Sequence, residues 1–313
     1  MSENDKNIAS NVATSENGSL NINIEKQLKI QKTLKIISRI IAYIFLTLFA
    51  IFAILPFYWM IISSLKTETV YRQPNPTFFI KPSEIQWSNY STVINSDNGL
   101  FGTTLINTLI VGVSSTFLGL IVTILTSFAF AKLEFKGKNL LFTLLLGTMM
   151  IPGELFTTTN FITVSKLDWT RTYTVMIIPF LVSIFYIYLL RNAFKQIPDS
   201  LYKAAKVDGC SDMKYLVKVM VPLTAPTIIS ITLLKFIGTW NSYIWPRLVN
   251  GGSKEWQLLS NWVSNGFTMP GSSESLNTLK MAAACMVSLP LLIVFICFRK
   301  YIMRGVSKSG IKG

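Results

Sequence analysis

Six apolar runs limit what this chain can fold into. A helix that crosses a bilayer needs about 20 apolar residues, because hydrocarbon offers no hydrogen-bond partner to an exposed backbone group. The runs, two of which are slightly short, cover residues 40–65, 105–131, 139–165, 172–190, 219–246 and 281–298. Composition agrees, since 50% of the 313 residues are hydrophobic and only 14% are charged. The sequence therefore predicts an all-α integral membrane protein with six transmembrane helices.

The positive charge of the chain indicates its orientation. Six crossings put both termini on one side, and the segments on that side carry 20 Lys and Arg residues against 8 on the other. Such an excess is typical of the cytoplasmic face. The net charge of +14 is thus explained by membrane topology, and we expect no nucleic-acid partner. Both termini are predicted to be cytoplasmic.

The apolar runs also predict the domain boundaries. The expected order is a cytoplasmic, partly disordered tail (1–36), a first helix (37–66), an extracytoplasmic loop (67–100), a core of five helices (101–301) and a cytoplasmic tail (302–313). Residues 1–24 are polar and lack the apolar core of a signal peptide, so we expect disorder there. The loops outside the membrane contain Trp87, Trp256 and Trp262. Such residues suit either the lipid interface or an external partner, and the sequence leaves both open.

The segment 197–226 separates two apolar runs yet contains four Lys and three Asp residues, so it cannot lie in hydrocarbon. Apolar residues recur in it at helical spacing on both sides of the pair Asp208-Gly209, which is suited to a sharp turn. We therefore predict two short amphipathic helices joined by a bend, in which Gly209 would tolerate a positive φ. An apolar face held outside the bilayer usually needs a partner surface.

Several classes of site are excluded or disfavoured. The chain has no His, and its three Cys residues lack metal-ligand spacing. Asp199, Asp208 and Asp212 lie beside lysines, which favours a charge-balanced surface over a metal site. No phosphate-binding loop of the Gly-x-x-x-x-Gly-Lys-Ser/Thr type is present. We expect neither a catalytic site nor a metal or cofactor held by this chain.

Short motifs in a set order give the chain a family resemblance. They are Asn107-Thr108-Leu109, Met150-Ile151-Pro152, Leu190-Arg191, Ala204-Ala205 with Asp208-Gly209, Pro222 and Pro226, Gly238-Thr239-Trp240-Asn241, Trp245-Pro246, and the tail from Arg304-Gly305 to Gly313. Together they resemble the permeases of ATP-binding-cassette (ABC) importers, and most closely the second permease of maltose-type carbohydrate systems. The resemblance covers about residues 100–313. It implies the type I importer transmembrane fold.

The resemblance also implies partners and a mechanism. The loop 197–220 would be a coupling loop that docks on a separate ATPase subunit, with Tyr202, Lys203, Ala204, Ala205, Asp208 and Gly209 at the contact. Lys203 departs from the family, which usually has glutamate there. The implied assembly contains a second permease, two ATPase subunits that bind and hydrolyse ATP, and an extracytoplasmic solute-binding protein, in a bacterial plasma membrane. An ion-coupled secondary carrier and a non-transporting membrane scaffold remain alternatives, and co-purification with an ATPase subunit would discriminate them.

Two charges lie inside predicted spans. Glu154 and Lys235 are both about 22–24 Å from the cytoplasmic ends of their runs, and such charges usually face the protein interior and find a partner. One hypothesis pairs them; the other has Lys235 extend outward and Glu154 face a water-filled space. Trp240 and Asn241 are candidates for the substrate pathway, although a Trp near a span end is often an interfacial anchor.

Overall fold

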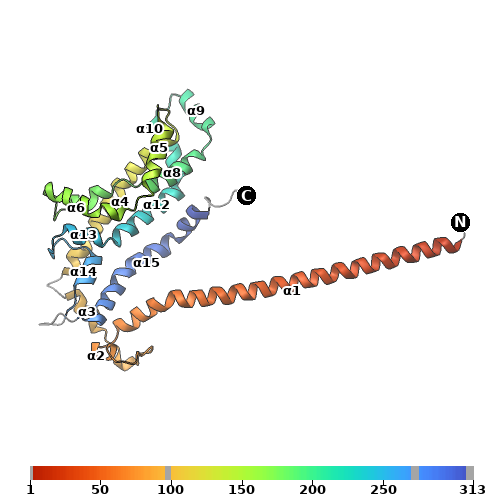
Figure 1. Ribbon diagram of the computed structural model, residues 1–313, viewed down its shortest axis with the longest axis horizontal. Coiled ribbons are helices and arrows are strands. Elements are labelled where there is room, and N and C mark those ends of the chain that lie inside the picture. The colour runs from red at the N-terminus through yellow and green to blue at the C-terminus, as the bar shows by residue number, and fades with distance from the viewer. Residues whose placement is uncertain (1–2, 96–99, 269–274, 308–313) are drawn as a thin grey trace. The chain divides into compact units, whose positions relative to one another are not determined.

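The computed structural model describes residues 3–95, 100–268 and 275–307. These residues are helical apart from short connections and one isolated bridge between Thr268 and Ser275 (Figure 1). The helices are α1 (Glu3–Ser64), α2 (Glu68–Tyr71), η1 (Pro82–Glu84), α3 (Ser88–Asn95), α4 (Leu100–Ala131), α5 (Lys138–Thr148), η3 (Gly153–Phe156), α6 (Thr157–Lys166), α7 (Tyr173–Ile177), η4 (Ile178–Phe180), α8 (Ile184–Lys195), α9 (Asp199–Val207), α10 (Asp212–Tyr215), η5 (Leu216–Met220), α11 (Val221–Leu223), α12 (Ala225–Trp240), α13 (Ile244–Val249), α14 (Leu259–Asn265) and α15 (Asn277–Ser307). The chain divides into two units, 1–59 and 60–313.

Three of the six predicted spans are not continuous helices. Three helices are long and apolar enough to cross a membrane alone, namely Gln31–Ser64 within α1, α4, and Asn277–Lys300 within α15. The other three are bent pairs, broken by 83° between α5 and η3–α6, by 47° between α7–η4 and α8, and by 83° between α10–α11 and α12. The number of spans is therefore six only if each bent pair crosses as one.

Proline accounts for the positions of the bends. Pro152 precedes η3, Pro179 lies in η4, and Pro226 stands in the first turn of α12. Proline has no N–H and clashes with the preceding turn, so it ends a helix more easily than it continues one, whereas it fits well at a helix start. Pro56 and Pro290 remain inside α1 and α15. Pro152, Pro179 and Pro226 thus stand at the three breaks.

The second unit is organised around α4. This helix packs against α8 and α12, and α12 packs in turn against α15 (Figure 1). Most residues on the inward face of α4 are small or polar, and such residues let helix backbones approach closely where water provides no driving force. The buried members are Thr104, Asn107, Thr108, Val111, Gly112, Ser115, Thr116, Gly119, Thr123, Ser127, Phe128 and Phe130.

Helix α2, which follows α1, is hydrogen-bonded to the start of α15. The Glu68 carboxylate accepts hydrogen bonds from the backbone N–H (3.0 Å) and the hydroxyl (2.9 Å) of Thr278, in the first turn of that helix. Burial opposes the charge on Glu68, but these bonds and the one from Arg72 outweigh it and lower the pKa of the carboxyl. Trp262 is 1% exposed and packs in a cluster with Trp240, and Trp256 packs against Tyr173. These two tryptophans are packing residues, while Trp87 remains exposed.

Three predicted boundaries need correction. Helix α1 begins at Glu3, so the tail expected to be disordered is helical, because a helix is extended at little cost once the apolar run has nucleated it. Helix α12 ends at Trp240, and Trp245 and Pro246 belong to the separate α13. Helix α15 continues to Ser307 into the predicted tail 302–313; residues 308–313, with most of the Gly-rich tail motif, lie outside the described residues.

Candidate functional site

The segment 197–220 folds as two short helices with a tight bend. Helix α9 ends at a Schellman motif, in which Gly209 N–H donates to Lys206 O (3.1 Å) and Cys210 N–H donates to Ala205 O (2.9 Å). Gly209 has φ +69°, a conformation that side chains with a Cβ disfavour. Ser211 then caps α10 by accepting a bond from Lys214 N–H. The two helices and the bend were predicted and are confirmed, and Gly209 adopts the positive φ that a glycine at this position allows.

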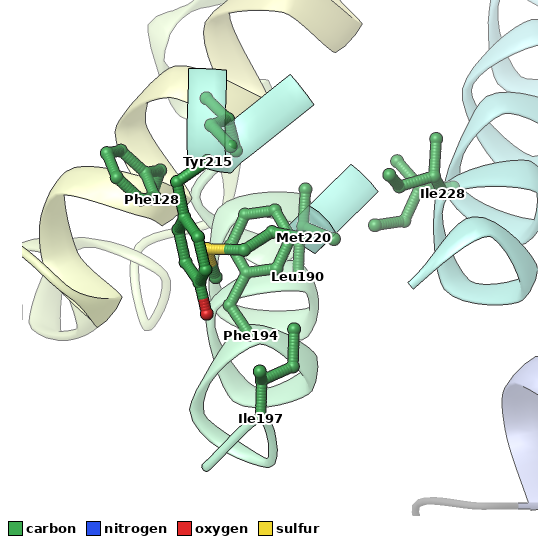
Figure 2. Close-up of a cluster of buried hydrophobic side chains, with 9 residues drawn as sticks. Phe128, Leu190, Phe194, Ile197, Tyr215, Met220 and Ile228 are labelled. Atoms are coloured by element: carbon green, nitrogen blue, oxygen red, sulfur yellow. The ribbon is translucent and has the colours of Figure 1, made fainter. Parts of the chain in front are cut away.

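A buried apolar cluster anchors this bend to the membrane helices. Figure 2 shows Met220 beside Leu190, Phe194 and Tyr215. Leu190, Phe194 and Met220 are fully buried and Tyr215 is 1% exposed. The ring of Tyr202 on α9 packs against that of Tyr215 in a tilted arrangement, with the ring centres 5.1 Å apart. The cluster therefore connects α9 and α10 to α8 through side-chain packing.

Polar contacts fix the orientation of α9. The buried Lys132 ammonium, at the end of α4, donates to Ile197 O (2.7 Å) and to the Asp199 carboxylate (2.6 Å). The hydrogen bond from Lys132 holds the pKa of Asp199 below its ordinary value. Asp212 accepts from the Tyr202 hydroxyl (2.6 Å) and pairs with Lys206 (2.7 Å), which raises the pKa of Lys206. Two of the three aspartates considered for a metal site thus pair with lysines.

Several apolar side chains of the bend are exposed, among exposed lysines such as Lys203, Lys206 and Lys214. No residue of α9 is buried, and Leu201, Val207, Met213 and Val217 are exposed by 46%, 89%, 56% and 57%. We call these four residues the outer face. Ala204 shares it, whereas Ala205 packs inward against the buried cluster. The two alanines, both expected at the contact with the ATPase subunit, therefore point in different directions because neighbours on a helix are about 100° apart.

Lys132 provides a test of the anchoring. Lys132→Met removes the cation and leaves the Ile197 carbonyl without this donor, which costs about 1–3 kcal/mol, so we expect a lower thermal midpoint for the purified permease at neutral pH. Because Asp199 has a lowered pKa when folded, the pair stabilises above the unfolded pKa of Asp199 and is lost as pH falls through the folded pKa. The difference in thermal midpoint between Lys132→Met and wild type should therefore become smaller in acid. Lys203→Met, at an exposed lysine of α9, is the control; equal midpoints for both variants would contradict the anchoring.

The two charges predicted inside spans do not meet. Glu154 is exposed on η3, and the structure contains no Glu154–Lys235 ion pair within the described residues. The Lys235 ammonium instead donates to Phe180 O at 2.8 Å, and the residue is only 6% exposed. The bend before η3 takes Glu154 off a straight helical path, so a depth counted along one helix does not place it. Lys235 does not extend outward either.

Lys235 lies at a cavity of about 320 Å³ between α4, α7–α8 and α12–α13. Trp245 and Phe180 also line it, with their rings 5.6 Å apart and edge to face. Trp240 does not line this cavity: it is 2% exposed in the cluster with Trp262, and Asn241 ends α12 on the exposed surface. The sequence motif around Trp240 thus pointed to this part of the chain, but Lys235 and Trp245, not Trp240, line the cavity.

Two of the motifs that the sequence displays have structural roles. Asn107 donates to Glu255 O (2.7 Å) and accepts from the Tyr173 hydroxyl (2.7 Å), so it ties the segment before α14 to α4. Arg191 donates to Phe130 O (3.1 Å), and its guanidinium lies 3.7 Å from the centre of the Phe142 ring. Sequence reasoning missed the contacts of Lys132 with Ile197 and Asp199. It also missed that Gly119 lies against the side chain of Lys235. In both cases the contacting residues are far apart along the chain.

Known proteins are similar to this chain in sequence. A family described as "Binding-protein-dependent transport system inner membrane component" matches residues 115–308. The arabinooligosaccharides transport system permease protein AraQ of Halalkalibacterium halodurans is 28% identical over 84% of this chain and 93% of its own length. The trehalose/maltose transport system permease protein MalG of Thermococcus litoralis is 28% identical over 89% of this chain and 99% of its own length.

A solved structure is similar as well. The crystal structure of a bacterial ABC transporter involved in the import of the acidic polysaccharide alginate contains a chain that matches with a TM-score of 0.74 and 26% identity, over 85% of this chain and 96% of that one. The family match spans more than half of the sequence and includes the bend at Gly209, the cavity and α15. The chain belongs to the family of binding-protein-dependent transport system inner membrane components, the permeases of ABC importers.

Proposed function

We propose that this protein is one permease of a bacterial ATP-driven carbohydrate importer and that the outer face docks on an ATPase subunit. The observation that carries the proposal is an exposed apolar surface on a rigid bend, in a chain that belongs to the importer permease family. The names of the relatives support a carbohydrate as the transported solute. A second permease would complete the pathway, a solute-binding protein would deliver the sugar, and the termini would be cytoplasmic.

The contacts suggest how the bend transmits force. When the ATPase pair closes on ATP, it moves α9 and α10. The buried cluster passes this motion to α8, while Lys132 and Asp199 pass it to α4. The π-helical turn Leu216–Met220 and the break before α12 are suitable hinges. ATP binding shifts the permease toward the outward-facing state only to the extent that the closed ATPase pair binds that state more tightly.

Val207→Asp tests the docking. Val207 is 89% exposed, so the substitution should leave the permease folded. A carboxylate in an apolar contact must be desolvated, so we expect co-purification of the ATPase subunit and ATP-driven sugar uptake to fall strongly. Phe79→Asp is the matched control, since Phe79 is 84% exposed on the loop between α2 and η1.

The outcomes separate the alternatives. Loss of ATPase association with Val207→Asp but not with Phe79→Asp supports docking on the outer face. If wild-type protein binds no ATPase subunit and its transport follows the membrane potential, the protein is an ion-coupled carrier. If it binds none and transports nothing, it is a scaffold.

A further inference from the structure

The Lys235 side chain at the cavity is a cation that has no acidic partner among the residues that the structure describes. Lys235 is 6% exposed, and its ammonium has three N–H donors, of which the Phe180 carbonyl takes one. The described residues that line the cavity include no Asp or Glu. Lys235 lies about 15 Å along α12 from Ala225, well inside a predicted span. A buried cation at such depth is costly unless paired, so the cavity is suited to an anion.

The surrounding fold makes room for the Lys235 side chain. Gly119 on α4 faces it so closely that a Cβ on residue 119 would lie 2.2 Å from Lys235 Cε and 2.6 Å from Nζ. The break between η4 and α8 frees the Phe180 carbonyl from helical bonding and turns it to Lys235. Three helical segments thus hold the ammonium at the wall of the cavity.

The remaining walls suit a sugar. Four residues that carry hydroxyl groups line the space together with Trp245, namely Ser115, Tyr186, Thr239 and Ser242. Hydroxyls exchange hydrogen bonds with sugar hydroxyls, and aromatic rings cover the apolar face of a sugar. A volume of about 320 Å³ is at the small end of ligand sites, which fits a short saccharide segment.

We infer that this cavity binds a sugar residue that carries a carboxylate, a uronic acid, with Lys235 as its counter-ion. The inference rests on the proposed function, and it narrows the carbohydrate from any sugar to an acidic one.

The test measures binding in the assembled importer without requiring transport. Ser242→Cys, in a chain whose Cys210, Cys285 and Cys297 are replaced by Ser, places a thiol at the cavity wall. The rate of its maleimide labelling is measured with trigalacturonate, with the uncharged methyl ester of trigalacturonate, and with maltotriose. We expect trigalacturonate to protect at roughly tenfold lower concentration than its ester, a difference of about 1.4 kcal/mol. Lys235→Gln, which keeps an N–H donor for the Phe180 carbonyl, should abolish that difference.

Each outcome decides the inference. Protection by the acid that depends on Lys235 supports it. Equal protection by acid and ester, or selectivity that survives Lys235→Gln, overturns the role of the charge. Absence of protection by any saccharide, in an importer that still hydrolyses ATP and takes up sugar, overturns the site but leaves the proposed function intact. The proposed function fails separately, if wild-type protein associates with no ATPase and imports no sugar.

Discussion

Gly209→Val should abolish sugar uptake while the protein still inserts into the membrane. At φ +69° a residue with a Cβ costs about 1–2 kcal/mol, and a β-branched residue costs more. No atom lies within 4 Å of a Cβ at this position, so the loss comes from the backbone and not from a clash within the chain. Relaxing that strain opens the bend and displaces α9 from α10. Uptake in cells and co-purification of the ATPase subunit are the measurements.

Two variants control this result. Gly209→Asn should keep most of the uptake, because Asn adopts the left-handed conformation more readily than other side chains. Gly252→Val introduces the same strain at φ +78°, also with free space around the Cβ, in the loop after α13. It should leave ATPase association unchanged. Normal uptake by a well-expressed Gly209→Val protein would contradict the docking proposal.

Gly119→Leu should prevent the second unit from folding. Its Cβ alone would overlap the end of Lys235 and lie 3.0 Å from the backbone carbonyl of Leu181. Lys235 can move, but a backbone oxygen at a helix break cannot move without repacking α4 against α8. Overpacking a core usually costs about 1–3 kcal/mol and sometimes more, and Leu adds three further carbon atoms. We expect little folded protein by size-exclusion chromatography in detergent.

A smaller change isolates the contact with Lys235. Gly119→Ala should lower the thermal midpoint, although Gly→Ala inside a helix is otherwise stabilising by up to about 1 kcal/mol. Adding Lys235→Ala should recover part of the loss, since it removes the atoms nearest to the new methyl group. Gly102→Ala, on the same helix with no atom within 4 Å of the Cβ, is the control and should be neutral or stabilising. Additive effects of the Gly119 and Lys235 changes would show that the two residues are independent.

Much of the fold could be predicted because its causes are local. The apolar runs are recognisable since a bilayer needs about 20 apolar residues per helix. The bend at Asp208-Gly209 is equally local, because the Schellman motif uses only backbone groups of Ala205, Lys206, Gly209 and Cys210. Even the break at Pro152 is indicated in the sequence, since Pro-Gly is a poor continuation of a helix. The size of each bend depends on neighbouring helices and was not predictable.

The sequence by itself thus determined the helical segments, the turn at Gly209 and the presence of two charges within the apolar runs. Only the tertiary structure decided what those charges contact. Glu154 and Lys235 have similar depths along their runs, but depth does not specify the direction of a side chain around the helix axis. That direction follows from packing. Gly119 leaves space for the Lys235 side chain beside α12, and the carbonyl of Phe180, at the break in its span, accepts a hydrogen bond from it. The bend before η3 leaves Glu154 on the exposed surface.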